Sequence, residues 1–148
     1  MILDGGCLCG DVRYSVECEH MPTTYACHCT DCHTQSGSAF GLQMPVTAEM
    51  INFTGIMREG KRKMPSGAAG SIYACETCAT RIYVANSSRP GLIILRAGTL
   101  DDSQDLVPRA HLWTKSKLAW VNIPDDAIAL ETQPASPEEW QGILFPAR

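Results

Sequence analysis

The chain has 148 residues, of which 45% are hydrophobic and 19% are charged, and this suits one globular domain with a sizeable core. Its formal net charge of −4 argues against a nucleic-acid-binding protein, which usually needs a basic face. No run approaches the roughly 20 apolar residues of a membrane span, and the first residues lack the pattern of a signal peptide, so we expect a cytoplasmic protein with no membrane partner.

The first predicted element is a strand over residues 12–18. Apolar and polar side chains alternate there, and Val12, Tyr14 and Val16 share the apolar face. Cys18 continues that face, so we expect it to be a small core thiol rather than a metal ligand. The next expected element is a turn or two of helix over Asp31–Gln35. The basic run Arg58–Lys63 is expected to form a solvated turn between strands.

Short segments rich in β-branched and aromatic residues predict the remaining strands, and turn residues bound each of them. They are Ser71–Cys75, Arg81–Ala85, Leu92–Ala97, Ala110–Thr114 and Leu118–Ile123. A second helix is expected to run from Pro137 to about Leu144, because Ser136 can cap it, Pro137 suits the first helical position and Glu139 completes a capping box. The sequence therefore predicts a mainly β fold with little helix, in one domain over residues 1–148 that has a core over 3–125 and a tail over 126–148.

Seven of the eight cysteines fall into three tight clusters, which is typical of metal sites in a protein from a reducing compartment. The clusters are Cys7 with Cys9, then Cys27 with Cys29 and Cys32, then Cys75 with Cys78. A structural zinc takes four thiolates, and a zinc that meets a substrate keeps one position open. Cysteines separated by two residues, or by one residue in an extended chain, can point both sulfurs at one ion. The spacing alone does not decide which clusters share a metal.

The cluster of Cys27, Cys29 and Cys32 has no obvious fourth ligand. Candidates for one are His28, His33, Cys18 and His111. His28 sits between two ligands and should point to the opposite side, so His33 is the best local competitor. If none of them binds, three thiolates leave a soft, electron-rich ion that suits a thiol as its fourth ligand, and such a thiol is held deprotonated. The chemistry this indicates is attack of a substrate thiolate on an electrophile, or the reverse.

The motifs together resemble the glutathione-dependent formaldehyde-activating family, which includes the centromere protein V-like zinc domain. The resemblance rests on all three cysteine clusters in their order and spacing, and it covers about residues 3–125. The segments that carry it are Gly5–Tyr14, Cys27–Cys32 with Ser36 and Gly37, Cys75–Cys78, Gly98–Asp102, His111–Trp113 and Trp120. One departure is Ala79, because the family usually has glycine directly after the last cysteine.

The resemblance implies a zinc-stabilised fold of the β-tent kind with two zinc ions per chain. Cys7, Cys9, Cys75 and Cys78 match the ligands of a structural zinc, and Cys27, Cys29 and Cys32 match those of a catalytic zinc. The implied activity is that of a carbon–sulfur lyase, which joins glutathione or a similar thiol to formaldehyde or another small aldehyde and also cleaves the adduct. Two alternatives stay open, namely a thiol carrier without catalysis and a zinc-stapled interaction module with two closed sites.

Other residues in the matched segments have simpler expected roles. Trp113 and Trp120 are expected to belong to the core rather than to a substrate platform. His111 is expected to be a buried histidine that forms hydrogen bonds. Asp101 and Asp102 are expected to be turn residues that follow a strand.

Overall fold

The structure is a computed structural model that describes residues 1–64 and 66–147. These residues form eleven strands and two α-helices, so the prediction of a mainly β fold with little helix is confirmed. The chain divides into two compact units, which we call unit 1 (residues 1–22 and 45–105) and unit 2 (residues 23–44 and from 106 onward). Neither helix in the described ranges has the length and apolar character needed to cross a membrane. A single domain over the whole chain stays a prediction.

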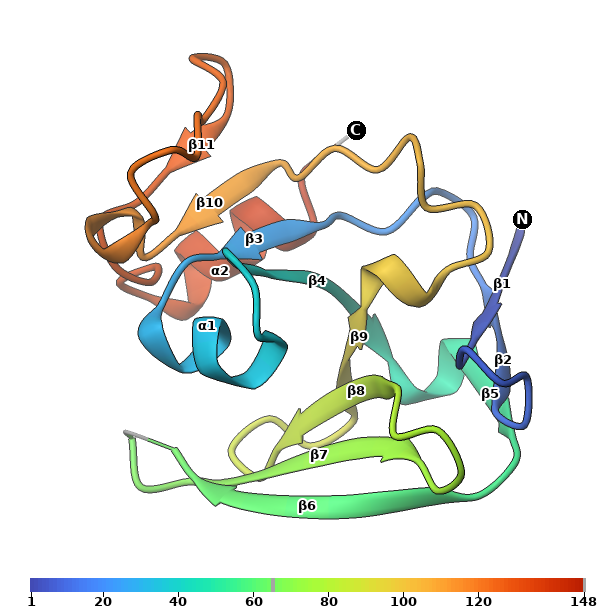
Figure 1. The fold of residues 1–148 in the computed structure, drawn as a ribbon. Coiled ribbons are helices and arrows are strands. Elements are labelled where there is room, and N and C mark those ends of the chain that lie inside the picture. Colours follow the sequence, from blue (N-terminus) through green and yellow to red (C-terminus); the bar gives the residue numbers. More distant parts are fainter. Residues whose placement is uncertain (65, 148) are drawn as a thin grey trace. The chain divides into compact units, whose positions relative to one another are not determined.

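Unit 1 contains a three-stranded antiparallel sheet in the order β1-β2-β5 (Figure 1). Its strands are β1 (Ile2–Gly6), β2 (Arg13–Glu17) and β5 (Ile51–Thr54). The predicted alternation in β2 is confirmed, because Tyr14 and Val16 are buried while Arg13 and Glu17 are exposed. Cys18 is also buried, as expected of a core thiol.

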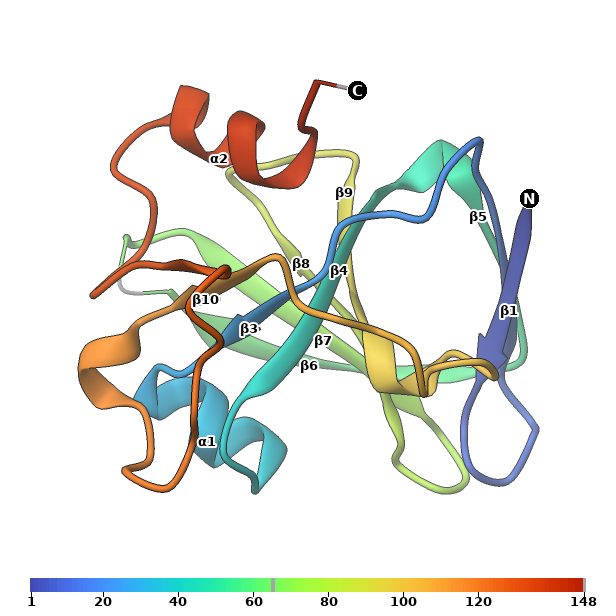
Figure 2. The same ribbon diagram turned by 90° about the horizontal axis from the view of Figure 1, so that it is seen from above.

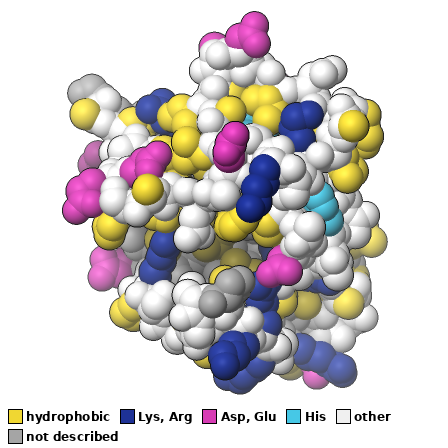
Figure 3. Space-filling model, turned by 90° about the vertical axis from the view of Figure 1, so that its left-hand side faces the viewer, with side chains coloured by type: hydrophobic (Ala, Val, Ile, Leu, Met, Phe, Trp, Pro, Cys, Tyr) yellow, Lys and Arg dark blue, Asp and Glu magenta, His cyan; other side chains and the backbone are white. Residues whose placement is uncertain are grey.

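Four further strands of unit 1 are hydrogen-bonded neighbours in the order β9-β8-β7-β6. They are β6 (Met57–Lys63), β7 (Ala69–Cys75), β8 (Arg81–Asn86) and β9 (Leu92–Arg96). The last three confirm predicted strands. The predicted turn over Arg58–Lys63 is wrong, because this segment is β6 and pairs along its whole length with β7. It is an edge strand with mostly exposed side chains, and charged residues are common on such edges. Figure 3 shows Lys and Arg side chains gathered at the bottom of the face that it draws.

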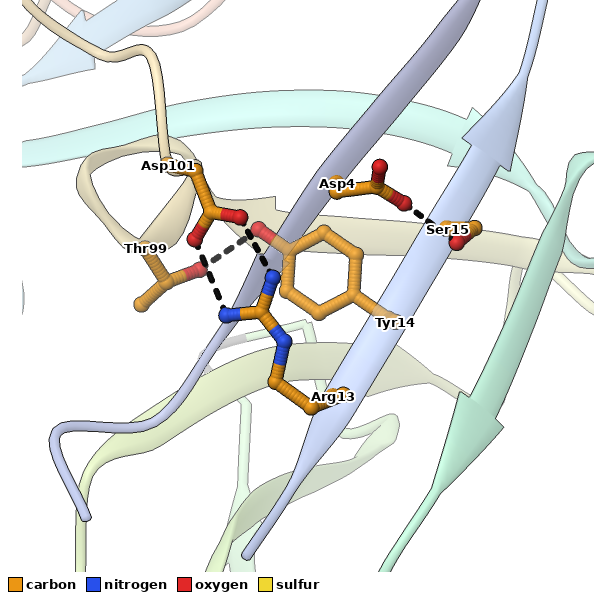
Figure 4. Close-up of polar contacts among 6 residues, drawn as sticks. All are labelled: Asp4, Arg13, Tyr14, Ser15, Thr99 and Asp101. Carbon is orange, nitrogen blue, oxygen red and sulfur yellow. Dashed lines mark hydrogen bonds and ion pairs between the residues drawn. The ribbon is translucent and has the colours of Figure 1, made fainter. Parts of the chain in front are cut away.

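A polar network joins the β1–β2 hairpin to the turn that follows β9 (Figure 4). The Arg13 guanidinium donates two hydrogen bonds to the Asp101 carboxylate, and one of them, from Nη1 to Oδ1, measures 2.9 Å. The hydroxyls of Tyr14 and Thr99 lie 2.8 Å apart, and the Asp101 N–H donates to the Asp4 carbonyl at 2.9 Å. Asp101 is a turn residue as predicted. The network fixes the strands that lead into and out of the first cysteine pair.

Unit 2 is built on the short strands β3 (Tyr25–Cys27), β10 (Ala110–Leu112) and β11 (Ile128–Ala129), which lie parallel in the order β11-β10-β3. The start of β4 (Gly41–Thr47) pairs antiparallel with β3, and the strand ends in unit 1. Helix α1 (Thr30–Ser36) follows β3 almost directly (Figure 2).

Helix α2 (Pro137–Leu144) confirms the predicted C-terminal helix and its cap. The Glu139 N–H donates to the Ser136 hydroxyl at 3.1 Å, and the Glu139 carboxylate accepts from the Ala135 N–H at 2.7 Å. Ile143 and Leu144 of this helix pack against Tyr25, Ala110 and Leu112 to form the core of unit 2.

The predicted strand Leu118–Ile123 is wrong. The segment is a turn, in which the Val121 N–H donates to the Leu118 carbonyl at 3.0 Å. Trp120 is 72% exposed, so the expectation that it belongs to the core is also wrong. Trp113 does pack against the core of unit 2, as predicted.

Candidate metal centres

The first candidate centre lies in unit 1 and consists of Cys7, Cys9, Cys75 and Cys78. Their four sulfur atoms all lie within 4.8 Å of one another. The Sγ atoms of Cys7 and Cys9 are 3.6 Å apart, and those of Cys9 and Cys75 are 3.8 Å apart. A zinc–sulfur bond of about 2.3 Å in tetrahedral geometry places neighbouring sulfurs about 3.8 Å apart. These four thiols therefore fit a tetrahedral zinc without rearrangement.

The first cysteine pair is held by the tight loop between β1 and β2. The Cys7 N–H donates to the Val12 carbonyl at 3.0 Å, and the Gly10 N–H donates to the Cys7 carbonyl at 3.2 Å. The Val12 N–H in turn donates to Cys7 Sγ at 3.2 Å. Burial raises the pKa of the Cys7 thiol, but this N–H and the thiols of Cys9 and Cys75 outweigh it and lower the pKa overall. The Val12 N–H therefore favours the thiolate form of Cys7, which a metal requires.

The second pair comes from a knuckle between β7 and β8, and Thr80 connects the two pairs. The Thr80 hydroxyl lies 3.1 Å from Cys78 Sγ and accepts a hydrogen bond from the Leu8 N–H at 3.2 Å. Contact with the Thr80 side chain and backbone lowers the pKa of Cys78 to about 5. Partners of this kind, just outside the ligands, orient the ligands and raise metal affinity.

The backbone of the knuckle is left-handed at Ala79. Its φ is 61°, and its N–H donates to the Cys75 carbonyl at 2.9 Å. An L-residue with a Cβ adopts this conformation at a cost of about 1–2 kcal/mol, which glycine does not incur. This is the strain expected from the absence of the family's usual glycine.

Ala79→Gly is therefore expected to raise the free energy of unfolding of the zinc-loaded protein by about 1 kcal/mol, because the relief of strain exceeds the added freedom of the unfolded chain. Urea unfolding followed by circular dichroism measures the change. Ala85→Gly in β8 is the matched control and should instead lower stability, since glycine weakens a strand. A lower midpoint for Ala79→Gly would contradict the assignment of strain.

The second candidate centre lies in unit 2 and consists of Cys27, Cys29 and Cys32, whose sulfur atoms also lie within 4.8 Å of one another. Cys27 ends β3, Cys29 is the N-cap of α1, and Cys32 is in the first turn of that helix. The Cys32 N–H donates to Cys29 Sγ at 3.3 Å. Interaction with the thiols of Cys27 and Cys32, together with this N–H, lowers the pKa of Cys29 to about 2. Interaction with the thiols of Cys29 and Cys32, together with burial, raises the pKa of Cys27. The cluster therefore carries negative charge readily at Cys29, and a cation would balance it.

Among the described residues, no fourth histidine, cysteine, aspartate or glutamate joins this cluster. His28 is fully buried and points elsewhere, as predicted, with its Nε2 2.9 Å from His111 Nδ1. His33 follows Cys32 but stays outside the group, and Cys18 belongs to the core of unit 1. The structure thus groups three thiols from one short segment, and this donor set fits a zinc ion with one further position for a ligand.

The histidine pair supports the chain around this cluster. The backbone N–H of His28 donates to the Leu112 carbonyl at 2.9 Å, and the Ser116 hydroxyl donates to the backbone carbonyl of His28 at 2.9 Å. Burial is the main cause that lowers the pKa of His28 to about 4, and burial also lowers the pKa of His111. Both rings are therefore neutral near pH 7. The expectation that His111 is a buried histidine in a hydrogen bond is confirmed.

Sequence reasoning missed one residue that contacts the cluster. Gln43 in β4 is buried, and its Nε2 lies 3.9 Å from Cys32 Sγ as a hydrogen-bond donor. It lies beyond the end of α1 and 11 residues after Cys32, and no spacing rule connects it to the cysteines. Only the antiparallel pairing of β3 with β4 brings it to this place.

Comparisons with known proteins find a matching family, a curated relative and a similar solved structure. The sequence profile of the family described as "Glutathione-dependent formaldehyde-activating enzyme" matches residues 2–116, a range that includes all seven clustered cysteines. A curated protein of Halomonas elongata named "Putative glutathione-dependent formaldehyde-activating enzyme" is 27% identical over an alignment of 148 positions, which covers 87% of this chain and 93% of that protein. A crystal structure of a Rhodobacter sphaeroides protein has a TM-score of 0.51 at 16% identity, over 86% of this chain and 98% of that one, and shows a similar fold.

Proposed function

The chain belongs to the glutathione-dependent formaldehyde-activating family, and from that premise we propose that it is an enzyme of the carbon–sulfur lyase type. It joins a small thiol, such as glutathione, to formaldehyde or another small aldehyde, and it also catalyses the reverse cleavage. The observation that supports the proposal most is that Cys27, Cys29 and Cys32 lie together. The described part of the chain offers this group no fourth ligand.

The two centres have different roles in this proposal. Cys7, Cys9, Cys75 and Cys78 hold a structural zinc, because their four thiolates complete a tetrahedron. Cys27, Cys29 and Cys32 hold the second zinc. Zinc held by three thiolates supplies a soft centre that favours a sulfur ligand and keeps a bound thiol deprotonated.

The reaction itself needs few groups from the protein. The thiol loses its proton to solvent as it binds, and its sulfur then attacks the carbonyl carbon of the aldehyde. A carbon–sulfur bond forms, the π electrons of the carbonyl move to oxygen, and water returns one proton there. The chain contributes position, since α1 and the neutral pair His28 and His111 hold the three thiols on one short, partly buried segment.

Exchange measurements by NMR at equilibrium test this function. Zinc-loaded protein is expected to accelerate the interconversion of glutathione and its hydroxymethyl adduct in proportion to protein concentration. Cobalt-substituted protein is expected to change its absorption spectrum when glutathione is added. A changed spectrum without acceleration would leave a thiol carrier, and an unchanged spectrum would leave a module with two closed sites.

A further inference from the structure

Gln43 is the only glutamine among the buried polar residues of the described chain. This residue is 6% exposed. Gln43 lies opposite Tyr25 in the β3–β4 pairing, and Tyr25 comes two residues before Cys27 along β3. Its Nε2 faces Cys32 Sγ at 3.9 Å. An amide N–H is the group that a thiolate attracts, so this contact fixes which end of the amide faces the sulfur.

The other end of the amide has no partner among the described residues. Gln43 Oε1 is buried and accepts no hydrogen bond. The two polar atoms of one amide are about 2.3 Å apart, so Oε1 lies within about 6 Å of Cys32 Sγ. A buried carbonyl oxygen without a donor is costly and rare in folded proteins. The nearby thiolates cannot supply a donor, because they only accept.

We propose that Gln43 Oε1 is the acceptor for a hydroxyl group of the bound substrate. This inference rests on the proposed function, in which the adduct carries a hydroxyl one carbon away from its sulfur. The Nε2 contact to Cys32 holds the amide beside the cluster, so that its oxygen stays within about 6 Å of Cys32 Sγ. Gln43 thereby distinguishes a sulfur ligand that bears a nearby hydroxyl from one that does not.

The test compares two small thiols that differ by one hydroxyl, 2-mercaptoethanol and ethanethiol, and needs no turnover. Their dissociation constants are measured from the absorption of the cobalt-loaded protein, for the wild type and for Gln43→Met. The ratio of the two constants is expected to shift by about fivefold against 2-mercaptoethanol in Gln43→Met, the effect of one lost hydrogen bond. Gln141→Met, at an exposed position in α2, is the matched control and should leave the ratio unchanged.

The outcomes separate this inference from the function beneath it. An unchanged ratio in Gln43→Met overturns the role of Gln43 while both thiols still bind. Failure of both thiols to bind the wild type overturns the proposed function and this inference with it. If Gln43→Met fails to take up cobalt, Gln43→Ala removes the same oxygen without crowding the strand and is expected to shift the ratio in the same direction.

Discussion

Cys75→Ser is expected to release the metal of the four-cysteine centre and to unfold unit 1. A structural zinc in a small thiolate site contributes on the order of 10–16 kcal/mol, which matches or exceeds the total stability of about 5–15 kcal/mol of most domains. Cys75 is only 2% exposed, and it lies where the end of β7 meets the knuckle. After the change to serine, no other side chain can take the place of the lost thiolate without moving the strand. Metal analysis should fall from two zinc ions per chain to one or none, with loss of the circular dichroism of the folded strands.

Cys18→Ser is the matched control for this change. Cys18 is buried in the same unit but stands outside both thiol groups. Its replacement should cost about 1–3 kcal/mol through burial of a hydroxyl, and the zinc content should stay at two per chain. Two zinc ions and an unchanged unfolding midpoint in Cys75→Ser would contradict a structural role for the four-cysteine centre.

Cys29→Ser is expected to abolish the acceleration of thiol addition while the protein stays folded. The reason is local, because Cys29 is both a candidate ligand and the N-cap of α1. Serine is a favoured N-cap and can accept the hydrogen bond from the Cys32 N–H, so the helix is kept while one thiolate is removed. The rate in the exchange experiment should fall by on the order of 100-fold or more, since even partners outside the ligands change affinity or activity by about 10–100-fold.

Three measurements read out this second variant. The zinc content should fall to one per chain, the unfolding transition of the remaining structure should persist, and the cobalt spectrum should no longer respond to glutathione. Cys27→Ser should behave in the same way, and it leaves the N-cap residue Cys29 unchanged. Full acceleration by Cys29→Ser would show that the three-cysteine group is not the reactive centre.

Much of the strand pattern follows from short-range signals in the sequence. The alternation around Tyr14 and the cap at Ser136 depend only on neighbours, so both predictions are confirmed. The segment at Arg58 has no apolar alternation because an edge strand needs none, and its pairing with β7 is set by the partner. The segment at Leu118 has strand-like residues but no partner strand within the described residues, and it closes as a turn instead.

In the candidate site, too, some features follow from neighbours in the sequence and others depend on distant strands. The spacing of Cys75 and Cys78, and of Cys27, Cys29 and Cys32, is sufficient to predict that each group can share an ion, and the structure brings each group together. That Cys7 and Cys9 meet Cys75 depends on the arrangement of two hairpins, which spacing does not encode. Gln43 and the pairing of His28 with His111 depend on strand register for the same reason.

The two thiol groups also differ in how far apart their members are along the chain. They are therefore expected to bind metal at different stages of folding. Cys27, Cys29 and Cys32 lie within six residues of chain, so they can capture an ion while the rest of the protein is still unfolded. Cys9 and Cys75 are 66 residues apart, and bringing the ends of such a loop together costs about 4 kcal/mol in chain entropy. Metal binding at the three-cysteine group therefore requires only local structure. Metal binding at the four-cysteine group requires that the long-range contacts of unit 1 have formed.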